Sequence, residues 1–286
     1  MNKLLHRFIL AGVLLLTAGA TAHAQDKNFY VFLCFGQSNM EGYPGIPEQD
    51  KMSVDPRFQV LAAVDFPELN RQTGQWYTAV PPLCRPHCGL SPADYFGRTL
   101  VTRLPATIKV GVVDVAVGGC KIELFDKTNC ATYVATAPVW MKPAIAAYGG
   151  NPYQHLVDMG KLAKKSGVIK GILLHQGESN TNDREWPAKV KAIYENLLKD
   201  LDLKAGDVPL IAGELMSAGQ KGACASMNEI IDTLPKVIPT AHVVSSQGCA
   251  GRPDHLHFTP EGYRKFGQRY AETMLPLLGM KTAEAK

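Results

Sequence analysis

The strongest constraint on the fold is a series of apolar runs that do not alternate with polar residues. These runs are FYVFLCF at 29–35, IKVGVVDVAVGG at 108–119, IKGILLHQGES at 169–179, VPLIAGEL at 208–215 and AHVVSSQG at 241–248. A strand with apolar side chains on both faces is usually buried on both faces, as in parallel sheets. The runs therefore predict a parallel sheet of about five strands.

Segments with helical character separate these runs. Two of them start at Ser91 and Thr259, each followed by a proline at the first helical position, and two more cover about 152–165 and 187–200. The last helix carries an apolar stripe at three- and four-residue spacing, made of Tyr263, Phe266, Tyr270 and Met274. Alternating strands and helices predict an α/β fold with helices on both faces and a ligand site at the carboxyl ends of the strands.

Two stretches do not fit this alternation. Residues 43–90 are rich in proline and turn residues, and residues 120–151 form a second long connection. Long loops inside a compact domain are usually functional. Because both follow carboxyl ends of strands, we expect both to wall a substrate site, within one domain that covers residues 25–286.

The first 24 residues have the pattern of a secretory signal sequence. Lys3 and Arg7 precede a short apolar stretch, and AHA at 22–24 supplies the small residues of a cleavage site. The apolar stretch is shorter than the ~20 residues that a membrane span requires. We expect cleavage near Ala24 and a protein that a bacterium exports to the periplasm or secretes.

The charge of the chain gives no reason to expect a polyanionic partner. Removal of Lys3 and Arg7 with the signal sequence would lower the formal net charge from +4 to +2. Neither a basic run nor a basic amphipathic helix stands out. We therefore expect no nucleic acid and no membrane as partner, whereas the sequence leaves the oligomeric state open.

The chain has seven cysteines, and an exported protein can keep disulfides. Cys34 falls inside the first apolar run and is expected to be a buried free thiol. Proximity in the loops suggests three pairs, although other connectivities are open: Cys84 with Cys88, Cys120 with Cys130, and Cys224 with Cys249. CRPHC at 84–88 is an alternative zinc motif, but no second pair of ligands lies at suitable spacing.

Four polar motifs stand at strand ends or before the last helix. They are GQSNM at 36–40, VGGC at 117–120, HQGESN at 175–180 and RPDHLHFTPEGY at 252–263. A serine becomes a nucleophile when a base takes its proton and a carboxylate orients that base. Ser38 is the candidate nucleophile, with His257 as base and Asp254 as its carboxylate.

An acyl transfer site also needs donors for the oxyanion. The candidates are the backbone amides of Ser38 and Gly119 and an amide side chain, Gln176 or Asn180. Each motif has a structural alternative, since Gly followed by Ser is often a turn and Asp254, His255 and His257 could be loop residues or metal ligands. GQSNM also lacks the second glycine of the G-x-S-x-G elbow, so the chain does not belong to the common fold with that motif.

The four blocks together resemble those of the SGNH hydrolases, in the branch of sialate O-acetylesterases and acetylxylan esterases of carbohydrate esterase family six. The resemblance extends from about residue 29 to about 275. Gly36 to Met40 match the first block in full, Gly118 and Gly119 the second, Gln176 to Asn180 the third, and Asp254, His257 and Phe258 the last. In the second block, Cys120 stands where a Thr or Ser often follows.

The resemblance implies a flavodoxin-like three-layer α/β/α sandwich and ester hydrolysis by Ser38, His257 and Asp254, without a cofactor or metal. It selects His257 rather than His255 as the base. By analogy, Gln176 is favoured for the oxyanion hole over Asn180. It also implies acetyl as the acyl group, and thus an acetylated carbohydrate as substrate: xylan, another polysaccharide or O-acetylated sialic acid.

Further substrate-binding candidates come from the matched blocks and from aromatic residues near strand ends. They are Gln37, Asn39, Glu178, Trp76, Trp140 and Trp186, with Tyr77 beside Trp76. Each ring is equally well explained as part of the core. Competing functions are a periplasmic lipase or thioesterase for longer acyl esters, a carbohydrate-binding protein without activity, and metal-dependent hydrolysis through Asp254, His255 and His257.

Overall fold

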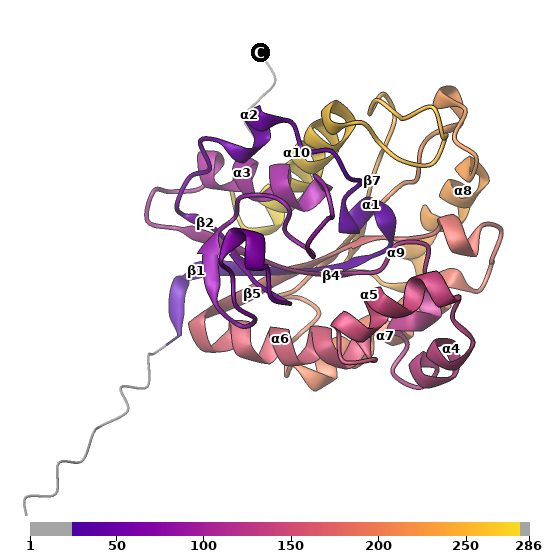
Figure 1. The fold of residues 1–286 in the computed structure, drawn as a ribbon, viewed down its shortest axis with the longest axis horizontal. Coiled ribbons are helices and arrows are strands. Elements are labelled where there is room, and N and C mark those ends of the chain that lie inside the picture. Colours follow the sequence, from indigo (N-terminus) through magenta and orange to yellow (C-terminus); the bar gives the residue numbers. More distant parts are fainter. Residues whose placement is uncertain (1–24, 281–286) are drawn as a thin grey trace, which may run out of the picture.

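A seven-stranded sheet forms the centre of the computed structural model, which describes residues 25–280 (Figure 1). The strand order is β3-β2-β4-β1-β5-β6-β7. β3 runs antiparallel to β2, and the other neighbours are parallel. The strands are β1 (Asp26–Gly36), β2 (Phe58–Leu61), β3 (Trp76–Thr78), β4 (Lys109–Ala116), β5 (Gly167–His175), β6 (Leu210–Gly213) and β7 (Ala241–Val244).

The five predicted strands are confirmed as β1, β4, β5, β6 and β7, but the expected strand number was too low. The two additional strands, β2 and β3, lie in the proline-rich stretch 43–90 and have only four and three residues. They form one edge of the sheet, where β3 pairs with β2 alone. Neither strand was predicted from an apolar run, so the pairing of β2 with β4 and of β3 with β2 decides that they are strands.

Helices cover both faces of the sheet, as predicted. α3 and α10 lie on one face, and α6 and α7 lie on the other (Figure 1). The helices are α1 (Ser38–Glu41), α2 (Glu48–Lys51), α3 (Pro92–Arg103), α4 (Cys130–Thr136), α5 (Lys142–Ala147), α6 (Pro152–Ser166), α7 (Trp186–Asp200), α8 (Asn228–Ile231), α9 (Leu234–Val237) and α10 (Pro260–Leu277). The 3₁₀ turns are η1 (Pro67–Leu69), η2 (Ile122–Phe125), η3 (Val139–Met141), η4 (Glu178–Asn180), η5 (Ala218–Gln220) and η6 (Ala225–Met227).

Local sequence signals explain where α3 and α10 begin. The Ser91 amide donates to Asp94 Oδ2 at 2.9 Å, and the Thr259 hydroxyl accepts from the Gly262 amide at 3.1 Å. These side chains satisfy groups that a helix start leaves unpaired. The predicted stripe of α10 is buried against the sheet, with Tyr263, Phe266, Tyr270 and Met274 at most 1% exposed.

The three central strands bring their motifs to one place. At the end of β1, Gly36 is opposite Ala116 of β4 and His175 of β5. The chain continues in register just beyond, because the Gln37 amide donates to His175 O at 3.0 Å and the Val117 amide to Gly36 O at 3.1 Å. GQSNM, VGGC and HQGESN therefore leave the sheet side by side.

All seven cysteines are free thiols in the structure, so the three expected disulfides are not formed. The predicted partners face other groups: Cys84 Sγ lies 3.1 Å from the Tyr148 hydroxyl, Cys120 Sγ 3.6 Å from Gly36 O and Cys130 Sγ 3.3 Å from Asn151 Oδ1. Cys224 Sγ lies 3.7 Å from Glu178 O. The side chains of Cys84 and Cys88 do contact each other, as their predicted proximity suggests, but without a disulfide. In the other two pairs, proximity along the chain was a poor guide because the thiols contact different groups. Cys34 is a buried free thiol, as expected.

The predicted signal sequence, residues 1–24, lies outside the described residues. Within residues 25–280, no helix combines the length and the apolar character needed to cross a bilayer.

Substitution of Gly36 by alanine tests how strictly the backbone at the end of β1 is constrained. It has φ +153°, and a Cβ atom there would lie 2.1 Å from His175 O. We expect Gly36→Ala to lower the free energy of unfolding by about 1–3 kcal/mol, since backbone of β5 must move. Urea denaturation measures this. Gly206→Ala is the matched control, because no atom lies within 4 Å of its added Cβ; equal stability of both variants and the parent would contradict the expectation.

Candidate active site

Ser38 lies at the start of α1, directly after β1 and Gln37. Its Oγ is 2.9 Å from Nε2 of His257, although the two residues are 219 positions apart. His257 comes from the loop before α10, and Tyr43 packs on its ring with the centroids 4.7 Å apart. A serine hydroxyl at hydrogen-bond distance from an imidazole is the arrangement in which the ring can take the hydroxyl proton.

Asp254 lies on the other side of the imidazole. Its Oδ2 is 2.9 Å from His257 Nδ1, and its Oδ1 accepts from the amides of Leu256 and His257, each at 2.9 Å. Partial burial alone would raise the pKa of Asp254, but these hydrogen bonds lower it below its usual value. The carboxylate thus stays ionised and holds the ring with Nε2 toward Ser38. The structure brings the three predicted residues together in the expected order.

Asn39 joins the serine turn to the histidine loop. Its Nδ2 donates to Leu256 O at 3.0 Å and to Glu178 Oε1 at 2.6 Å. Its Oδ1 accepts from the Phe258 amide at 3.4 Å and from the Tyr263 hydroxyl at 2.8 Å. Asn39 is fully buried, and both polar atoms of its side chain bind protein groups. It was predicted to bind substrate, but the structure places it beneath the site as a positioning residue.

Backbone amides near Ser38 are available as donors. The amides of Ser38 and Gly119 make no hydrogen bond to any described residue. Gly119 has φ +70°, a conformation that favours glycine, and its carbonyl accepts from Ser179 Oγ at 2.8 Å. Ser179 therefore fixes the glycine turn. Ser179 was not among the predicted site residues, although it lies inside the HQGESN block.

The two amide side chains predicted for the oxyanion hole are used elsewhere. Gln176 Nε2 donates to Gln37 Oε1, Cys120 O and Asn180 Oδ1, and its Oε1 accepts from the indole of Trp186. Asn180 Oδ1 accepts also from the Ile122 amide, and its Nδ2 donates to Glu123 and Asp183. The tertiary contacts of these buried amides take up their hydrogen-bonding groups, so among residues 25–280 neither side chain has a donor left over.

Gln37 has the amide group that remains free. Its Oε1 accepts from Gln176 Nε2 at 3.0 Å and from the amides of Gly177 and Ser179, each at 3.3 Å. Its Nε2 has no protein partner among residues 25–280, and Gln37 lines the pocket at Ser38. The hydrogen bonds to Oε1 thus fix the position of the Nε2 donor in the same amide group.

The tryptophans differ in their relation to the site. Trp186 is fully buried beneath Gln176, and Trp76 packs on Phe29 at the β3 edge with ring centroids 4.6 Å apart. Trp186 belongs to the core, Trp76 is half-buried against it, and neither lines the pocket at Ser38. Tyr77 is likewise on β3 and accepts from the Gln72 amide at 2.9 Å. Trp140 alone is near the site and exposed, at 65%.

The catalytic pocket, as we call the hollow at Ser38, has a volume of about 420 Å³. Its lining combines expected and unexpected residues: Gln37, Ser38, Gly118, Gly119, Glu178, Ser179, Cys224, Leu256 and His257. Cys224 and Leu256 carried no signal in the sequence, because their positions depend on how two distant loops meet. Glu178 was expected here; it contributes a buried carboxyl whose pKa is raised by burial.

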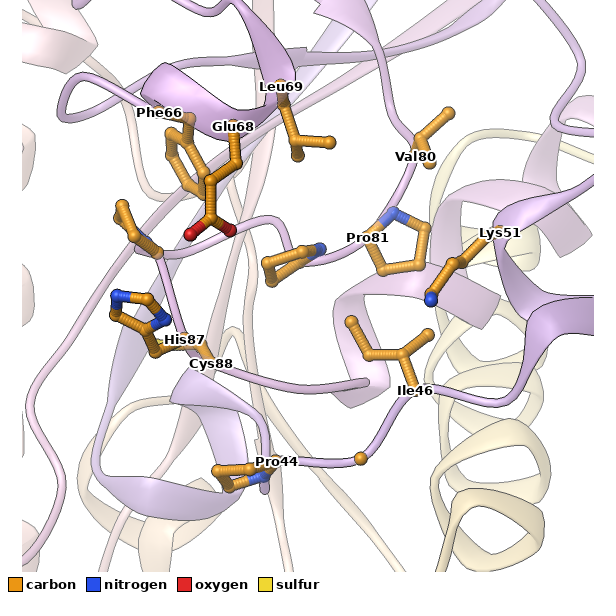
Figure 2. Close-up of a pocket in the computed structure, with 13 residues that line it drawn as sticks. Pro44, Ile46, Lys51, Phe66, Glu68, Leu69, Val80, Pro81, His87 and Cys88 are labelled. Carbon is orange, nitrogen blue, oxygen red and sulfur yellow. The ribbon is translucent and has the colours of Figure 1, made fainter.

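A second hollow lies in the loops of residues 44–88 and has a volume of about 520 Å³. Figure 2 shows Ile46, Phe66 and Pro81 around it, with Glu68 and Lys51 on opposite sides. None of its lining residues belongs to the catalytic pocket. The stretch predicted to wall the substrate site therefore forms a separate hollow here.

His255 does not join a metal site with its neighbours. It has φ +60°, its side chain is exposed, and its carbonyl accepts from the Ala223 amide at 2.9 Å. Asp254 and His257 bind each other instead. Within residues 25–280, no group of three or more His, Cys, Asp or Glu side chains has an arrangement that would hold a metal ion.

Several solved structures share this fold. A protein from Arabidopsis thaliana is 22% identical, with a TM-score of 0.67 over 88% of this chain and 99% of its own. NanS is 17% identical, with a TM-score of 0.63 over 90% of this chain and 99% of its own. A carbohydrate acetylesterase from Xanthomonas citri is 18% identical, with a TM-score of 0.61 over 88% of this chain and 57% of its own. The fold is that of the SGNH hydrolases.

Residues 28–276 match the family model of carbohydrate esterases described as sialic acid-specific acetylesterase. The match covers most of the chain, so the protein belongs to this family. It is a carbohydrate O-acetylesterase, and its substrate is an acetylated carbohydrate.

The positioning role of Asn39 can be tested directly. We expect Asn39→Ala to lower kcat for 4-nitrophenyl acetate by roughly 10²-fold, since a small displacement of the loop moves His257 away from Ser38. KM should change little, because Asn39 has no free group for substrate. Tyr263→Phe is the control, since it removes only one of the four contacts and should cost much less. An Asn39→Ala variant with parental kcat would show that other contacts position the loop.

Proposed function

We propose that the protein is an exported serine esterase that removes O-acetyl groups from carbohydrates through an acetyl-enzyme on Ser38. The observation that carries this proposal is the continuous chain of hydrogen bonds from Ser38 Oγ to His257 and from His257 to Asp254, both 2.9 Å long. Family membership supplies the carbohydrate ester as substrate. Export rests on the signal pattern of residues 1–24.

The reaction follows from these contacts. Ser38 Oγ attacks the acetyl carbonyl while His257 Nε2 takes its proton, and the Asp254 carboxylate stabilises the imidazolium. His257 then gives the proton to the sugar oxygen, and the C–O bond of the ester breaks. In the second half, His257 takes a proton from water, and the resulting hydroxide attacks the acetyl carbonyl. His257 then returns the proton to Ser38 Oγ as the bond between Oγ and the acetyl carbon breaks, which releases acetate and restores the free enzyme.

Three donors are proposed for the oxyanion. Among residues 25–280, the amides of Ser38 and Gly119 have no hydrogen-bond partner, and neither has Nε2 of Gln37, the amide side chain that lines the pocket. Donors held before the reaction stabilise the charge that develops on the carbonyl oxygen. In this proposal Gln37, rather than Gln176 or Asn180, supplies the amide side chain of the oxyanion hole. Gln176 supports it from behind, by donating to Gln37 Oε1.

The acetylated glycan itself is either a polysaccharide such as xylan or O-acetylated sialic acid. In either case, an exported deacetylase would clear acetyl groups that block glycosidases. Acetate release from acetylated xylan and from O-acetylated sialic acid, measured side by side with purified mature protein, decides between them. A rate that rises with acyl length from 4-nitrophenyl acetate to the octanoate would instead indicate a lipase or thioesterase.

Ser38→Ala tests the nucleophile. We expect it to lower kcat for 4-nitrophenyl acetate by about 10⁴-fold or more, because no acetyl-enzyme can form. Circular dichroism should show an intact fold. Ser245→Ala is the control, since this hydroxyl binds Glu214 at 2.8 Å. Parental activity in Ser38→Ala would make Ser38 a turn residue and would overturn the proposed mechanism.

Gln37→Glu tests the third oxyanion donor. This change keeps an acceptor for Gln176 and the two amides but replaces the Nε2 donor by an oxygen. We expect kcat to fall by roughly 10²–10³-fold with little change in KM, as for loss of one oxyanion donor. Steady-state kinetics on 4-nitrophenyl acetate measures both constants. If kcat keeps its parental value, Gln37 does not contact the oxyanion.

A further inference from the structure

A large cavity adjoins the catalytic pocket on the side of Gly119. It has a volume of about 750 Å³ and lies among η2, α4 and η3. Gly119 and Ser179 line both hollows, so the cavity continues from the place where the ester would bind. We call it the α4 cavity; its wall includes Lys121, Asn129, Thr132, Tyr133, Thr136 and Met141.

Trp140 lies beside Gly119, which lines both hollows. A Cβ atom on Gly119 would come within 2.6 Å of Trp140 Cη2, so the ring edge reaches the residue that both hollows share. The ring is 65% exposed, and the preceding Val139 is 81% exposed. Neighbouring exposed apolar side chains beside a reactive centre indicate a surface that a ligand covers.

The α4 cavity has a mixed lining. Hydroxyl and amide groups come from Thr132, Thr136 and Asn129, and apolar surface comes from Tyr133, Ala137, Pro138 and Met141. A sugar ring, which carries hydroxyl groups and also an apolar C–H face, fits such a lining. Glu123 on the wall is neutralised by Lys189 at 2.7 Å. Among residues 25–280, Lys121 has no carboxylate partner at ion-pair distance, and its ammonium is exposed. Polar groups close to an exposed aromatic ring suit a pyranose, whose C–H face packs on a ring.

Resting on the proposed function, we propose that the α4 cavity is a second sugar subsite and that Trp140 is its stacking platform. The acetylated residue occupies the catalytic pocket, and a neighbouring residue of the same glycan occupies the α4 cavity. The natural substrate is therefore an oligosaccharide or polysaccharide rather than a monosaccharide.

The test compares matched short and long substrates. The pairs are acetylated xylose with acetylated xylotetraose, and free O-acetylated sialic acid with O-acetylated sialyllactose. We expect a higher kcat/KM for the longer member of at least one pair. Trp140→Ala should lower that kcat/KM about 10- to 100-fold through KM, as for loss of one buried aromatic contact. Activity on 4-nitrophenyl acetate should stay at the parental value.

Two further variants separate the subsite from a general effect of the ring. Thr132→Trp, on the exposed wall of α4, fills the cavity without touching the catalytic pocket and should lose the preference for the longer substrate. Leu277→Ala, an exposed apolar residue of α10, is the control and should change nothing. Thermal melts check that each variant folds.

A binding measurement gives a readout that does not need turnover. In the Ser38→Ala background, the longer substrate should change tryptophan fluorescence, because Trp140 is the exposed indole and Trp186 is buried. Adding Trp140→Ala should remove that change and weaken binding by a similar factor.

Several outcomes would overturn the subsite. The first is equal kcat/KM within both pairs, or hydrolysis of neither pair, by an enzyme that still cleaves 4-nitrophenyl acetate through Ser38. The second is an equal loss on all substrates in Trp140→Ala, which would mean that the ring acts through Gly119. The third is a loss of activity in Trp140→Ala that is confined to 4-nitrophenyl octanoate, which would make the cavity an acyl pocket. Absence of any esterase activity would instead contradict the proposed function.

Discussion

The site depends on the in-register ends of three parallel strands. β4, β1 and β5 are neighbours at the centre of the sheet, and Gly36 is opposite both Ala116 and His175. Because parallel strands end at the same edge, three motifs far apart in the chain leave the sheet together. The first supplies Ser38 and Gln37, the second supplies Gly119, and the third supplies groups that hold the other two. Without this register, no local motif would form a site.

Most polar residues of the motifs hold one another. Asn39 contacts the loop of His257 from below, Gln176 contacts Gln37 and Cys120, and Ser179 contacts the carbonyl of Gly119. A buried polar group without a partner is costly, so each of these contacts also restricts where its neighbours can lie. The consequence for function is a set of reactive groups in fixed positions before substrate arrives. Preorganisation of this kind is what stabilisation of a developing charge requires.

The two long connections have different relations to this site. Residues 120–151 form η2, α4 and η3, which reach Gly119 and carry the exposed Trp140. Residues 43–90 form the two edge strands and a separate hollow, although Tyr43 at their start packs on His257. Substrate recognition beyond the ester is therefore expected from residues 120–151, where the hollow is continuous with the catalytic pocket.

The sequence by itself determined the parts whose physics is local or periodic. Apolar runs predicted strands β1, β4, β5, β6 and β7, and capping residues predicted the starts of α3 and α10. The spacing of Asp254 and His257 is also local, since the carboxylate binds amides two and three positions ahead. Only the tertiary structure decided that β2 and β3 are strands, that the cysteines are unpaired, and that Gln37 rather than Gln176 has a free amide group. These outcomes depend on which groups from distant parts of the chain contact each side chain. The spacing of residues along the chain does not contain that information.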